Sequence, residues 1–492
     1  MNHANNLKHT HHDAENNSPL KKRRTKIIVT MGPAIDSVEA IQSLLRIGVN
    51  VFRLNMSHGD HKTHERYYQM IRNQAYCREC HTTIMADLCG PKIRCGMFQD
   101  GGITLTKGKT ITITTRNVEG RAGLIASQYT ALHKDVSVGQ RILLADGVMQ
   151  LRVLECDGYD VLCRIEAGGV LTNHKGINLP DSTVSAPALT KKDLLDADFS
   201  AALGVDFLAL SFVRTADDVL ELRRYLNQRD VGIIAKIERP EAVENAADIV
   251  RVADGIMVAR GDLGVEIPAE QVPLAQQMLI DTARSMDKPV IVATQMLESM
   301  IEHARATRAE VTDVFHSVTD GTDAVMLSAE TAAGQYPLEA ASTMDRIVRY
   351  AETCLWQQSA FRGLSTRKNP LPPLTFGDAV ARAMAGLSCD LMVRAIVVFS
   401  PTGVTAKAMA AARPEAPMLV VSTSPNICRR LNLLWGVIPV LVDADEMTEP
   451  CVLAGKLALR FGLAMQGESI LLVQGFHKDH ALNHPSITVI CV

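Results

Sequence analysis

The stretch that decides the fold is a run of buried-type residues that ends in charge, Ile233-Ile234-Ala235-Lys236-Ile237-Glu238. A second such run follows along the chain, Ile256-Met257-Val258-Ala259-Arg260-Gly261-Asp262. Charge that ends an apolar run is costly to bury unless it binds a metal or an ionic ligand. Lys236 and Glu238 are two residues apart, so on a strand their side chains point to the same side. With Asp262 at the end of a neighbouring strand, they predict a divalent-metal and phosphate site; the alternative is a buried ion pair that only shapes the core.

Runs of this kind recur along the chain and alternate with helical stretches. There are eight: Lys26–Thr30, Val49–Leu54, Thr83–Asp87, Val205–Phe212, Gly232–Ile237, Gly255–Ala259, Pro289–Thr294 and Asp323–Ser328. Eight strands of a βα alternation close into a barrel, in which ligands bind at the carboxyl ends of the strands. Polar residues follow the runs rather than precede them: Arg53, Asn55, Ser57, Asp87, Ser211, Thr294, Gln295, Ser328 and Glu330. We therefore predict an α/β fold with a (β/α)8 TIM barrel made of residues 25–90 and 186–360.

Residues 91–185 interrupt this alternation between the third and fourth runs. They lack a helical period and hold short alternating runs such as Thr110–Thr114 and Arg141–Leu144. Turn signals such as Asp146-Gly147 and Asp157-Gly158 separate these runs. The segment predicts a small β barrel inserted into the larger barrel, and an insertion above strand ends is a natural lid.

A third unit is predicted at residues 361–492. A proline-containing linker, residues 365–373, leads into five further strand-like runs separated by helical stretches: Ala395–Phe399, Met418–Val421, Ile438–Val442, Ile470–Val473 and Ile487–Ile490. This pattern predicts a separate α/β domain of Rossmann-like type. Its segment Ser400-Pro401-Thr402-Gly403-Val404-Thr405 follows a strand and opens a helix. Such a segment either cradles a phosphate at a helix N-terminus or simply caps the helix.

Composition excludes several classes of protein. The formal net charge of the 492 residues is −3, which argues against a broad nucleic-acid surface, and no run of about 20 apolar residues exists to span a bilayer. Residues 1–24 are polar and histidine-rich, lack the apolar core of a secretory signal, and are predicted to form a disordered tail. The eleven cysteines are scattered, which favours a reducing cytoplasm without structural disulfides. One segment, Cys77–His81, matches the C-x-x-C-H haem pattern, but covalent haem attachment needs export.

Several segments together resemble the signatures of the pyruvate kinase family. They occur in the family's order from about Arg24 to the C-terminus: Arg53–Gly59, Ile234–Glu238, Met257–Gly264, Ala293–Glu298, Arg308–Val311 and Met326–Thr331. The resemblance implies transfer of the phosphoryl group of phosphoenolpyruvate to ADP, giving pyruvate and ATP, with Mg²⁺ or Mn²⁺ bound by Glu238 and Asp262. Phosphoryl transfer depends mainly on positioning and charge neutralisation, which cationic side chains and metal ions supply.

The same resemblance implies roles for further residues. Lys236 would lie against the moving phosphoryl group, and Arg53 and Arg94 would hold phosphate oxygens with their planar guanidinium groups. The substrate carboxylate would be bound by Thr294 and by the backbone N–H groups from Ala259 through Arg260 and Gly261 to Asp262. Thr294 would also take part in protonating the enolate. The residues expected to bind the nucleotide are Asn55, His58 and Arg94.

One departure from the family pattern concerns potassium. Members that require potassium carry Thr-Lys and Glu where this chain has Leu88, Cys89 and Lys92, as in the potassium-independent group. A fixed ammonium on Lys92 can replace the charge of a monovalent cation. We therefore expect activity without potassium. We also expect Asn55, Ser57 and Asp87, which match potassium ligands of the family, to contact Lys92 and the arginines.

The C-terminal domain resembles the family's effector domain. The resemblance implies that Ser400, Thr402, Gly403 and Thr405 bind an allosteric sugar phosphate or nucleotide monophosphate, with Gly475–Lys478 as a second contact, and that the chain forms a homotetramer. Three rival interpretations stay open. The chain could be a Mg²⁺-dependent lyase acting on a pyruvate enolate, or a phosphate-sensing protein without catalysis. His58, His61 and His64 could also form a zinc cluster.

Overall fold

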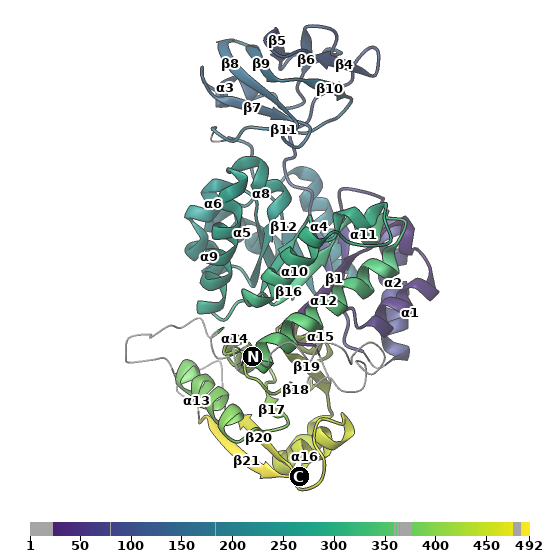
Figure 1. The fold of residues 1–492 in the computed structure, drawn as a ribbon, viewed down its shortest axis with the longest axis vertical. Coiled ribbons are helices and arrows are strands. Elements are labelled where there is room, and N and C mark those ends of the chain that lie inside the picture. Colours follow the sequence, from purple (N-terminus) through teal and green to yellow (C-terminus); the bar gives the residue numbers. More distant parts are fainter. Residues whose placement is uncertain are drawn as a thin grey trace, which may run out of the picture.

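The computed structural model describes residues 23–78, 80–182, 184–358, 361, 364, 376–475 and 484–492. Most of the predicted tail, the linker 365–373 and Phe476–Lys478 lie outside these residues. Three units follow one another along the long axis of the molecule, with the lid at one end, the barrel in the middle and the C-terminal domain at the other end (Figure 1). No helix within the described ranges has both the length and the apolar character needed to cross a membrane.

The middle unit is a closed barrel of eight parallel strands, as the sequence predicts. The strands, in order around the barrel, are β1 (Lys26–Thr30), β16 (Ala324–Leu327), β15 (Val290–Ala293), β14 (Gly255–Ala259), β13 (Gly232–Ile237), β12 (Phe207–Leu210), β3 (Thr83–Asp87) and β2 (Val51–Asn55). Four of the predicted runs match the strand limits at both ends. Barrel strands are buried on both faces, which explains why they read as continuous apolar runs rather than alternating ones.

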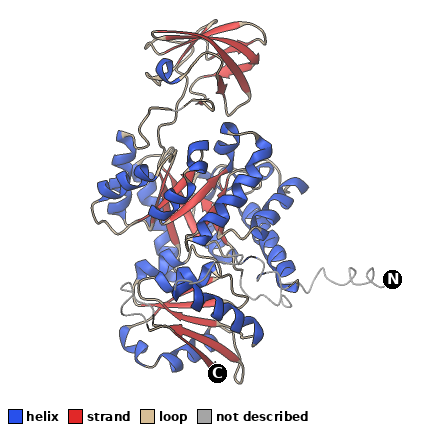
Figure 2. Ribbon diagram, turned by 90° about the vertical axis from the view of Figure 1, so that its left-hand side faces the viewer, coloured by secondary structure: helices blue, strands red, loops and turns tan. Residues whose placement is uncertain are grey.

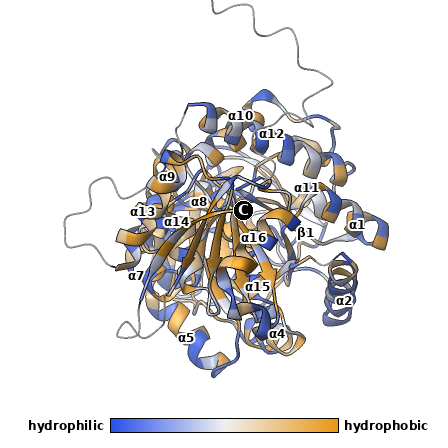
Figure 3. Ribbon diagram, turned by 90° about the horizontal axis from the view of Figure 1, so that it is seen from below, coloured by the Kyte–Doolittle hydropathy of each residue, from blue (hydrophilic) through white to orange (hydrophobic). Residues whose placement is uncertain are grey.

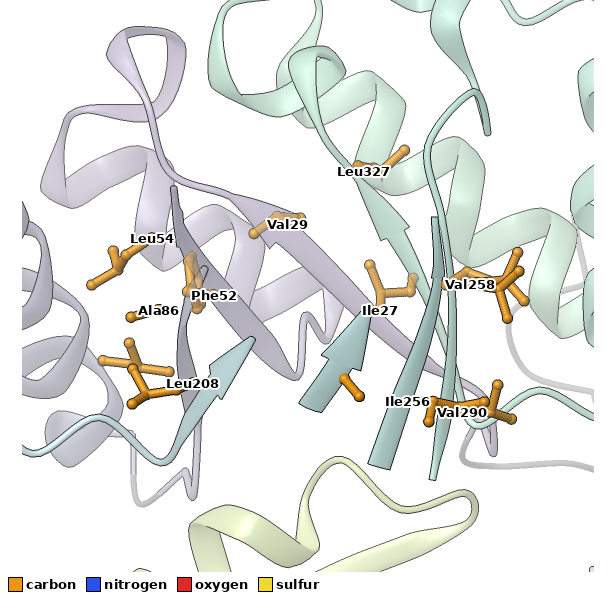
Figure 4. Packing of buried hydrophobic residues seen from close by; sticks show 14 of the residues in the cluster. Ile27, Val29, Phe52, Leu54, Ala86, Leu208, Ile256, Val258, Val290 and Leu327 are labelled. Atoms are coloured by element: carbon orange, nitrogen blue, oxygen red, sulfur yellow. The ribbon is translucent and has the colours of Figure 1, made fainter. Parts of the chain in front are cut away.

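Alternate residues of each strand serve two different cores. Figure 4 shows one set, which faces the surrounding helices: Ile27, Val29, Phe52, Leu54, Ala86, Leu208, Ile256, Val258, Val290 and Leu327. The other set fills the barrel interior: Ile28, Val51, Met85, Phe207, Ala209, Ile234, Met257, Ile291, Ala293, Ala324 and Met326. By this period of two, Arg53, Asp87 and Lys236 occupy interior positions at the carboxyl ends of their strands. Each fully buried apolar side chain contributes about 1.5–3 kcal/mol, so this register is strongly fixed.

Helices cover the outside of the barrel. They are α1 (Val38–Ile47), α2 (His61–Cys77), α4 (Lys191–Leu203), α5 (Ala216–Leu226), α6 (Pro240–Glu244), α7 (Ala246–Val252), α8 (Arg260–Glu266), α9 (Val272–Ser285), α10 (Arg308–Thr319), α11 (Ala329–Ala332) and α12 (Pro337–Gln357). Side-chain caps fix where several of them begin: Asp60 accepts from Thr63 N, and Thr190 and Thr307 form capping boxes with Asp193 and Glu310. The haem-like pair Cys77 and Cys80 lies exposed at the end of α2, and none of the eleven cysteines forms a disulfide.

The lid follows β3 and forms its own β unit beyond the strand ends of the barrel (Figure 2). It contains β4 (Gly102–Leu105), β5 (Thr110–Thr114), β6 (Leu124–Ala126), α3 (Leu132–Asp135), β7 (Arg141–Leu144), β8 (Met149–Asp157), β9 (Asp160–Ala167), β10 (Gly169–Thr172) and β11 (Ile177–Asn178). Hydrogen bonds join six strands in the order β11-β7-β8-β9-β5-β6 and pair β10 with β4. The lid has its own apolar core, which includes Ile113, Leu144 and Val161, so it is a separate unit.

The C-terminal domain is a five-stranded sheet with helices on both faces. Its strands run in the order β19 (Val437–Leu441), β18 (Met418–Ser422), β17 (Ile396–Phe399), β20 (Ser469–Gln474) and β21 (Ser486–Cys491), and only β21 is antiparallel to its neighbour. Its helices are α13 (Phe376–Asp390), α14 (Val404–Ala411), α15 (Pro425–Leu431) and α16 (Pro450–Arg460). Apolar residues concentrate on the central strands (Figure 3). The domain also reaches into the barrel, since its Leu433 joins the apolar cluster of the barrel interior.

Candidate active site

Four strands bring a charged cluster to the lid end of the barrel. Lys236 Nζ lies 2.8 Å from Glu238 Oε1 and 3.3 Å from Asp87 Oδ1, and it donates to Ser211 Oγ at 2.8 Å. Arg53 Nε donates to Asp87 Oδ2 at 2.6 Å. The side chains come from β2, β3 and β13 and from the turn after β12. Residues nearly 200 positions apart therefore form one connected group of two cations and two carboxylates.

Burial makes the charges of this group interdependent. Glu238 and Asp87 are 1% exposed and Lys236 is 9% exposed. Burial alone would lower the pKa of Lys236, but the charges of Asp87 and Glu238 outweigh it, and the pKa lies above that of a free lysine. Burial opposes ionisation of Asp87 too, yet Lys236 and Arg53 hold its pKa below the usual value. Lys236 therefore remains an ammonium and Asp87 a carboxylate at neutral pH.

Glu238 and Asp262 form the carboxylate pair expected to bind the metal. Asp262 lies in the first turn of α8, not on the strand, and β14 ends three residues before it. Burial raises the pKa of Glu238, and the charge of Asp262 raises it further, while Lys236 opposes both. A pair of carboxylates in which the charge of one opposes ionisation of the other, as Asp262 does for Glu238, is stabilised by a divalent cation with oxygen ligands. These residues thus fit Mg²⁺ or Mn²⁺.

The residues that follow β14 and β15 continue the site next to β13. Thr294 Oγ1 accepts a hydrogen bond from Gly261 N at 2.7 Å and donates to Ala293 O at 2.6 Å. Thr294 has a φ of 68°, a conformation that non-glycine residues rarely adopt and that often marks functional sites. The side chain of Arg260 points away from the cluster, because it pairs with Asp313 at 2.6 Å and donates to Thr294 O. Arg260 can therefore offer only its backbone to a ligand at this site.

Two predicted cations are not part of the cluster in this structure. Arg94 Nη1 donates to His174 O at 2.9 Å within the lid. The side chain of Lys92 is exposed and has no hydrogen-bond or ion-pair partner among the residues that the structure describes. The expected contact of Lys92 with Asp87 is not formed, and Asp87 pairs with Arg53 and Lys236 instead. Lys92 instead lines, together with Asp262, a cavity between the lid and the barrel.

The predicted nucleotide residues lie on the loop between β2 and α2. Asn55 ends β2 and its Oδ1 accepts from Ser57 N at 3.2 Å, while the side chain of His58 is exposed. The three histidines of this region do not converge on one point. His61 pairs with Asp196 at 2.8 Å, and His64 Nε2 bonds the carbonyl of His58 at 2.9 Å. Within the described ranges no group of three or more metal-ligating side chains is present, so the zinc alternative finds no support.

A group that joins the lid to the predicted metal ligands was not among the residues predicted from the sequence. Asn178 Nδ2 of the lid donates to Glu266 Oε1 at 2.9 Å, and Arg239 lies 3.9 Å from the same oxygen. Arg239 also donates to the carbonyl of Ser182. Arg239 directly follows Glu238, and Glu266 lies one helical turn after Asp262, so their adjacency to metal residues was the available clue. This group therefore joins residues 178–182, at the end of the lid, to the segments that carry Glu238 and Asp262.

The phosphate-cradle segment of the C-terminal domain has the geometry of a capped helix. Ser400 is fully buried and its Oγ accepts from Ala406 N at 3.2 Å. Thr405 is buried, whereas Thr402 is exposed, and Gly403 has a φ of 83° at the start of α14. Glycine adopts this conformation without strain. Capping accounts for Ser400, and of the four predicted residues only Thr402 is exposed, because Gly403 is buried as well.

The barrel, the lid and the charged cluster between them define the chain as a phosphotransferase, an enzyme that moves a phosphoryl group between two bound substrates. Two family models match it, the pyruvate kinase barrel domain at residues 22–341 and the pyruvate kinase alpha/beta domain at residues 378–489. The chain belongs to the pyruvate kinase family.

Individual relatives agree with the family models. The chain is 43% identical to a pyruvate kinase of Geobacillus stearothermophilus over 463 residues, which cover 92% of this chain and 78% of that protein. It is 44% identical to a pyruvate kinase of Corynebacterium efficiens over 437 residues, covering 87% and 89%. Among solved structures, a pyruvate kinase from Cryptosporidium parvum superimposes with a TM-score of 0.88 at 36% identity, covering 96% of each chain. Membership implies transfer of the phosphoryl group of phosphoenolpyruvate to ADP, giving pyruvate and ATP, and disfavours the lyase and the non-catalytic alternatives.

Proposed function

We propose that this chain is a Mg²⁺-dependent pyruvate kinase, also active with Mn²⁺, in which Glu238 and Asp262 hold the metal. The observation that carries the proposal is the Lys236 ammonium, 2.8 Å from Glu238 Oε1, with the charge of Asp262 acting on the same carboxylate. When bound, the metal would neutralise charge on the phosphoryl and enolate oxygens.

The remaining roles follow from where each group can donate. Lys236 and Arg53 both pair with Asp87 and are proposed to bind phosphoryl oxygens, together with Arg94. The backbone N–H groups of residues 259–262 and Thr294 are proposed to bind the substrate carboxylate. Thr294, whose hydroxyl already bonds Gly261 N, is proposed to assist proton delivery to the enolate. Asn55, His58 and Arg94 are proposed to contact ADP.

We further propose that activity does not require potassium, because Lys92 supplies the charge. Leu88, Cys89 and Lys92 support this, and so does the position of Lys92 on the cavity that Asp262 also lines. Since the side chain is exposed and without a partner in the described residues, it is available to a bound phosphate. Turnover in buffer free of potassium and sodium tests the proposal. A rise by orders of magnitude on adding potassium would refute it.

Regulation and assembly complete the proposal. The segment with Ser400, Thr402, Gly403 and Thr405 is proposed to bind a sugar phosphate or a nucleotide monophosphate. A homotetramer is proposed, and an apolar exposed patch on α10 and α12, with Val311, Phe315 and Tyr350, supports contact between subunits. A cytoplasmic location is proposed, because the eleven cysteines are scattered along the chain as in proteins of a reducing compartment. The four segments 1–24, 25–90 with 186–360, 91–185 and 361–492 are proposed as the domain limits.

The deciding experiment is a coupled assay of pyruvate formation from phosphoenolpyruvate and ADP. Wild type is compared with Lys236→Met, each with and without Mg²⁺ and with and without potassium. The proposal expects turnover by wild type that needs the divalent metal but not potassium, and strong loss in Lys236→Met. Wild-type turnover that persists with the metal chelated would contradict the assignment of Glu238 and Asp262.

A further inference from the structure

The loop from Met56 to Asp60, which we term the nucleotide loop, is held from outside by helix α4. Lys192 Nζ of α4 donates to Met56 O at 2.7 Å and to Asp196 Oδ2 at 2.5 Å. The other oxygen of Asp196 lies 2.8 Å from Nε2 of His61, the first residue of α2. One carboxylate on α4 therefore holds both ends of the nucleotide loop, the first through Lys192 and the second through His61.

The Asp196 carboxylate is buried, whereas the two side chains that bind it are largely exposed. The side chain of Asp196 is 4% exposed, whereas those of Lys192 and His61 are 56% and 46% exposed. The carboxylate is thus covered by its two partners, and a hydrogen bond to a buried charge is stronger than one between exposed groups. The His61 ring also stacks on Phe199 of α4 with centroids 4.1 Å apart and planes inclined by 2°. Its orientation is fixed by two independent contacts.

The same helix begins at the lid. Its capping residue Thr190 ends the segment that leads from β11 of the lid back to the barrel, and Asp193 Oδ1 accepts from Gly90 N at 2.9 Å in the segment that leads from β3 into the lid. Asp193 is fully buried. The first two turns of α4 therefore contact the nucleotide loop and both segments on which the lid stands.

We propose that Lys192, Asp196 and His61 are positioning residues for ADP. They hold the nucleotide loop where Asn55 and His58 meet the nucleotide, and α4 connects this hold to the lid. The proposal rests on the proposed function, because Asn55 and His58 are assigned to the nucleotide there. None of the three residues contacts the charged cluster around Lys236, so their effect is confined to one of the two substrates.

The test is steady-state kinetics of the full chain with each substrate varied in turn. Lys192→Met and His61→Phe are compared with Lys191→Met, which removes the neighbouring exposed lysine, a side chain without a partner among the described residues. His61→Phe keeps an aromatic ring for stacking on Phe199 but removes the partner of Asp196. The expected result is a rise in KM for ADP of about fivefold or more in both variants, with kcat and KM for phosphoenolpyruvate within about twofold of wild type. Lys192→Arg is expected to keep most of the ADP affinity.

A second readout separates positioning from a general loss of structure. The shift in Tm caused by ADP should shrink in Lys192→Met and His61→Phe, while the shift caused by phosphoenolpyruvate should not change. Equal rises of both KM values, or an ADP KM equal to that of Lys191→Met, would overturn the inference. Absence of turnover in wild type would instead overturn the proposed function, so the two failures are distinguishable.

Discussion

The guanidinium of Arg413, in the C-terminal domain, donates to both carboxylate oxygens of Asp323, at the base of the barrel, over 3.0 and 2.9 Å. Asp323 Oδ1 also accepts from Trp435 N, and Arg413 lies 5.0 Å from the centroid of the Trp435 ring. Asp323 immediately precedes β16. Arg413 lies two residues after α14, so the pair connects that helix of the C-terminal domain to the start of β16 in the barrel.

Arg413→Met should strongly destabilise the junction between these two units. Removing one partner of a buried ion pair leaves an uncompensated charge and typically costs about 3–5 kcal/mol. Urea unfolding followed by tryptophan fluorescence is the suitable measurement, because Trp435 lies at this junction. Arg394→Met is the control, since Arg394 pairs with Glu468 at the surface and its loss should cost less than about 1 kcal/mol. Equal effects of the two substitutions would contradict this account.

Lys236→Met should reduce kcat by at least about a thousandfold, as expected when a cation directed at developing charge is lost. Because Asp87 and Glu238 raise the pKa of Lys236, the ammonium should not titrate in the neutral range. No fall in wild-type kcat between about pH 6 and 9 should therefore trace to this group. Differential scanning fluorimetry would check that the variant stays folded. A variant with more than a tenth of wild-type kcat would refute the role of Lys236.

Glu238→Gln and Asp262→Asn should each weaken binding of Mn²⁺ by about a hundredfold or more, since each removes one of two anionic ligands. The electron paramagnetic resonance signal of free Mn²⁺ measures this directly and needs no turnover. Glu221→Gln is a matched control, because Glu221 is an exposed carboxylate on α5, remote in sequence from both ligands. Unchanged Mn²⁺ affinity in Asp262→Asn would remove Asp262 from the metal site. In wild type, chelation of the metal should abolish activity, and Mg²⁺ should restore it.

Gly261→Ala should disturb the contact between Gly261 and the Thr294 side chain. A Cβ at position 261 would lie 3.2 Å from Thr294 Oγ1, closer than ordinary van der Waals contact allows. The threonine hydroxyl would shift or lose its bond to Gly261 N, and KM for phosphoenolpyruvate should rise by about tenfold. Gly264→Ala, in the same helix, is the comparison, since its Cβ would meet nothing closer than 3.6 Å. Similar kinetics of the two variants would show that the contact is unimportant.

The sequence predicts much of this arrangement because periodicity is a local property. The run Gly232–Ile237 fixes β13 at both ends, and the spacing of Lys236 and Glu238 places both side chains in the site. Contacts that depend on the relative placement of units are not local. The exposed position of Lys92 depends on how the lid stands above the barrel, and the bond of Lys192 to Met56 O joins residues 136 positions apart. No pattern within either segment contains that information.

Lys26 should give the stability of the chain a pH dependence of known sign. Its Nζ donates to Val437 O at 2.6 Å where the barrel meets the C-terminal domain. Burial lowers its pKa to about 7, with help from the neighbouring charges of Arg23 and Arg24 and against those of Glu352 and Asp323. In the unfolded chain the pKa returns to about 10.4.

Between these two values the unfolded chain binds a proton that the folded chain does not. The contribution of Lys26 to the free energy of unfolding therefore rises with pH from about 7 to about 10.4, by at most about 1.4 kcal/mol per pH unit, and is constant below that window. Lys26→Met lacks this dependence. Urea unfolding of wild type and Lys26→Met at pH 6.5, 7.5, 8.5 and 9.5 should show the wild type gaining stability relative to the variant at each step above about pH 7. Parallel curves would mean that Lys26 keeps an ordinary pKa at the junction, and that burial between the two domains does not govern its charge.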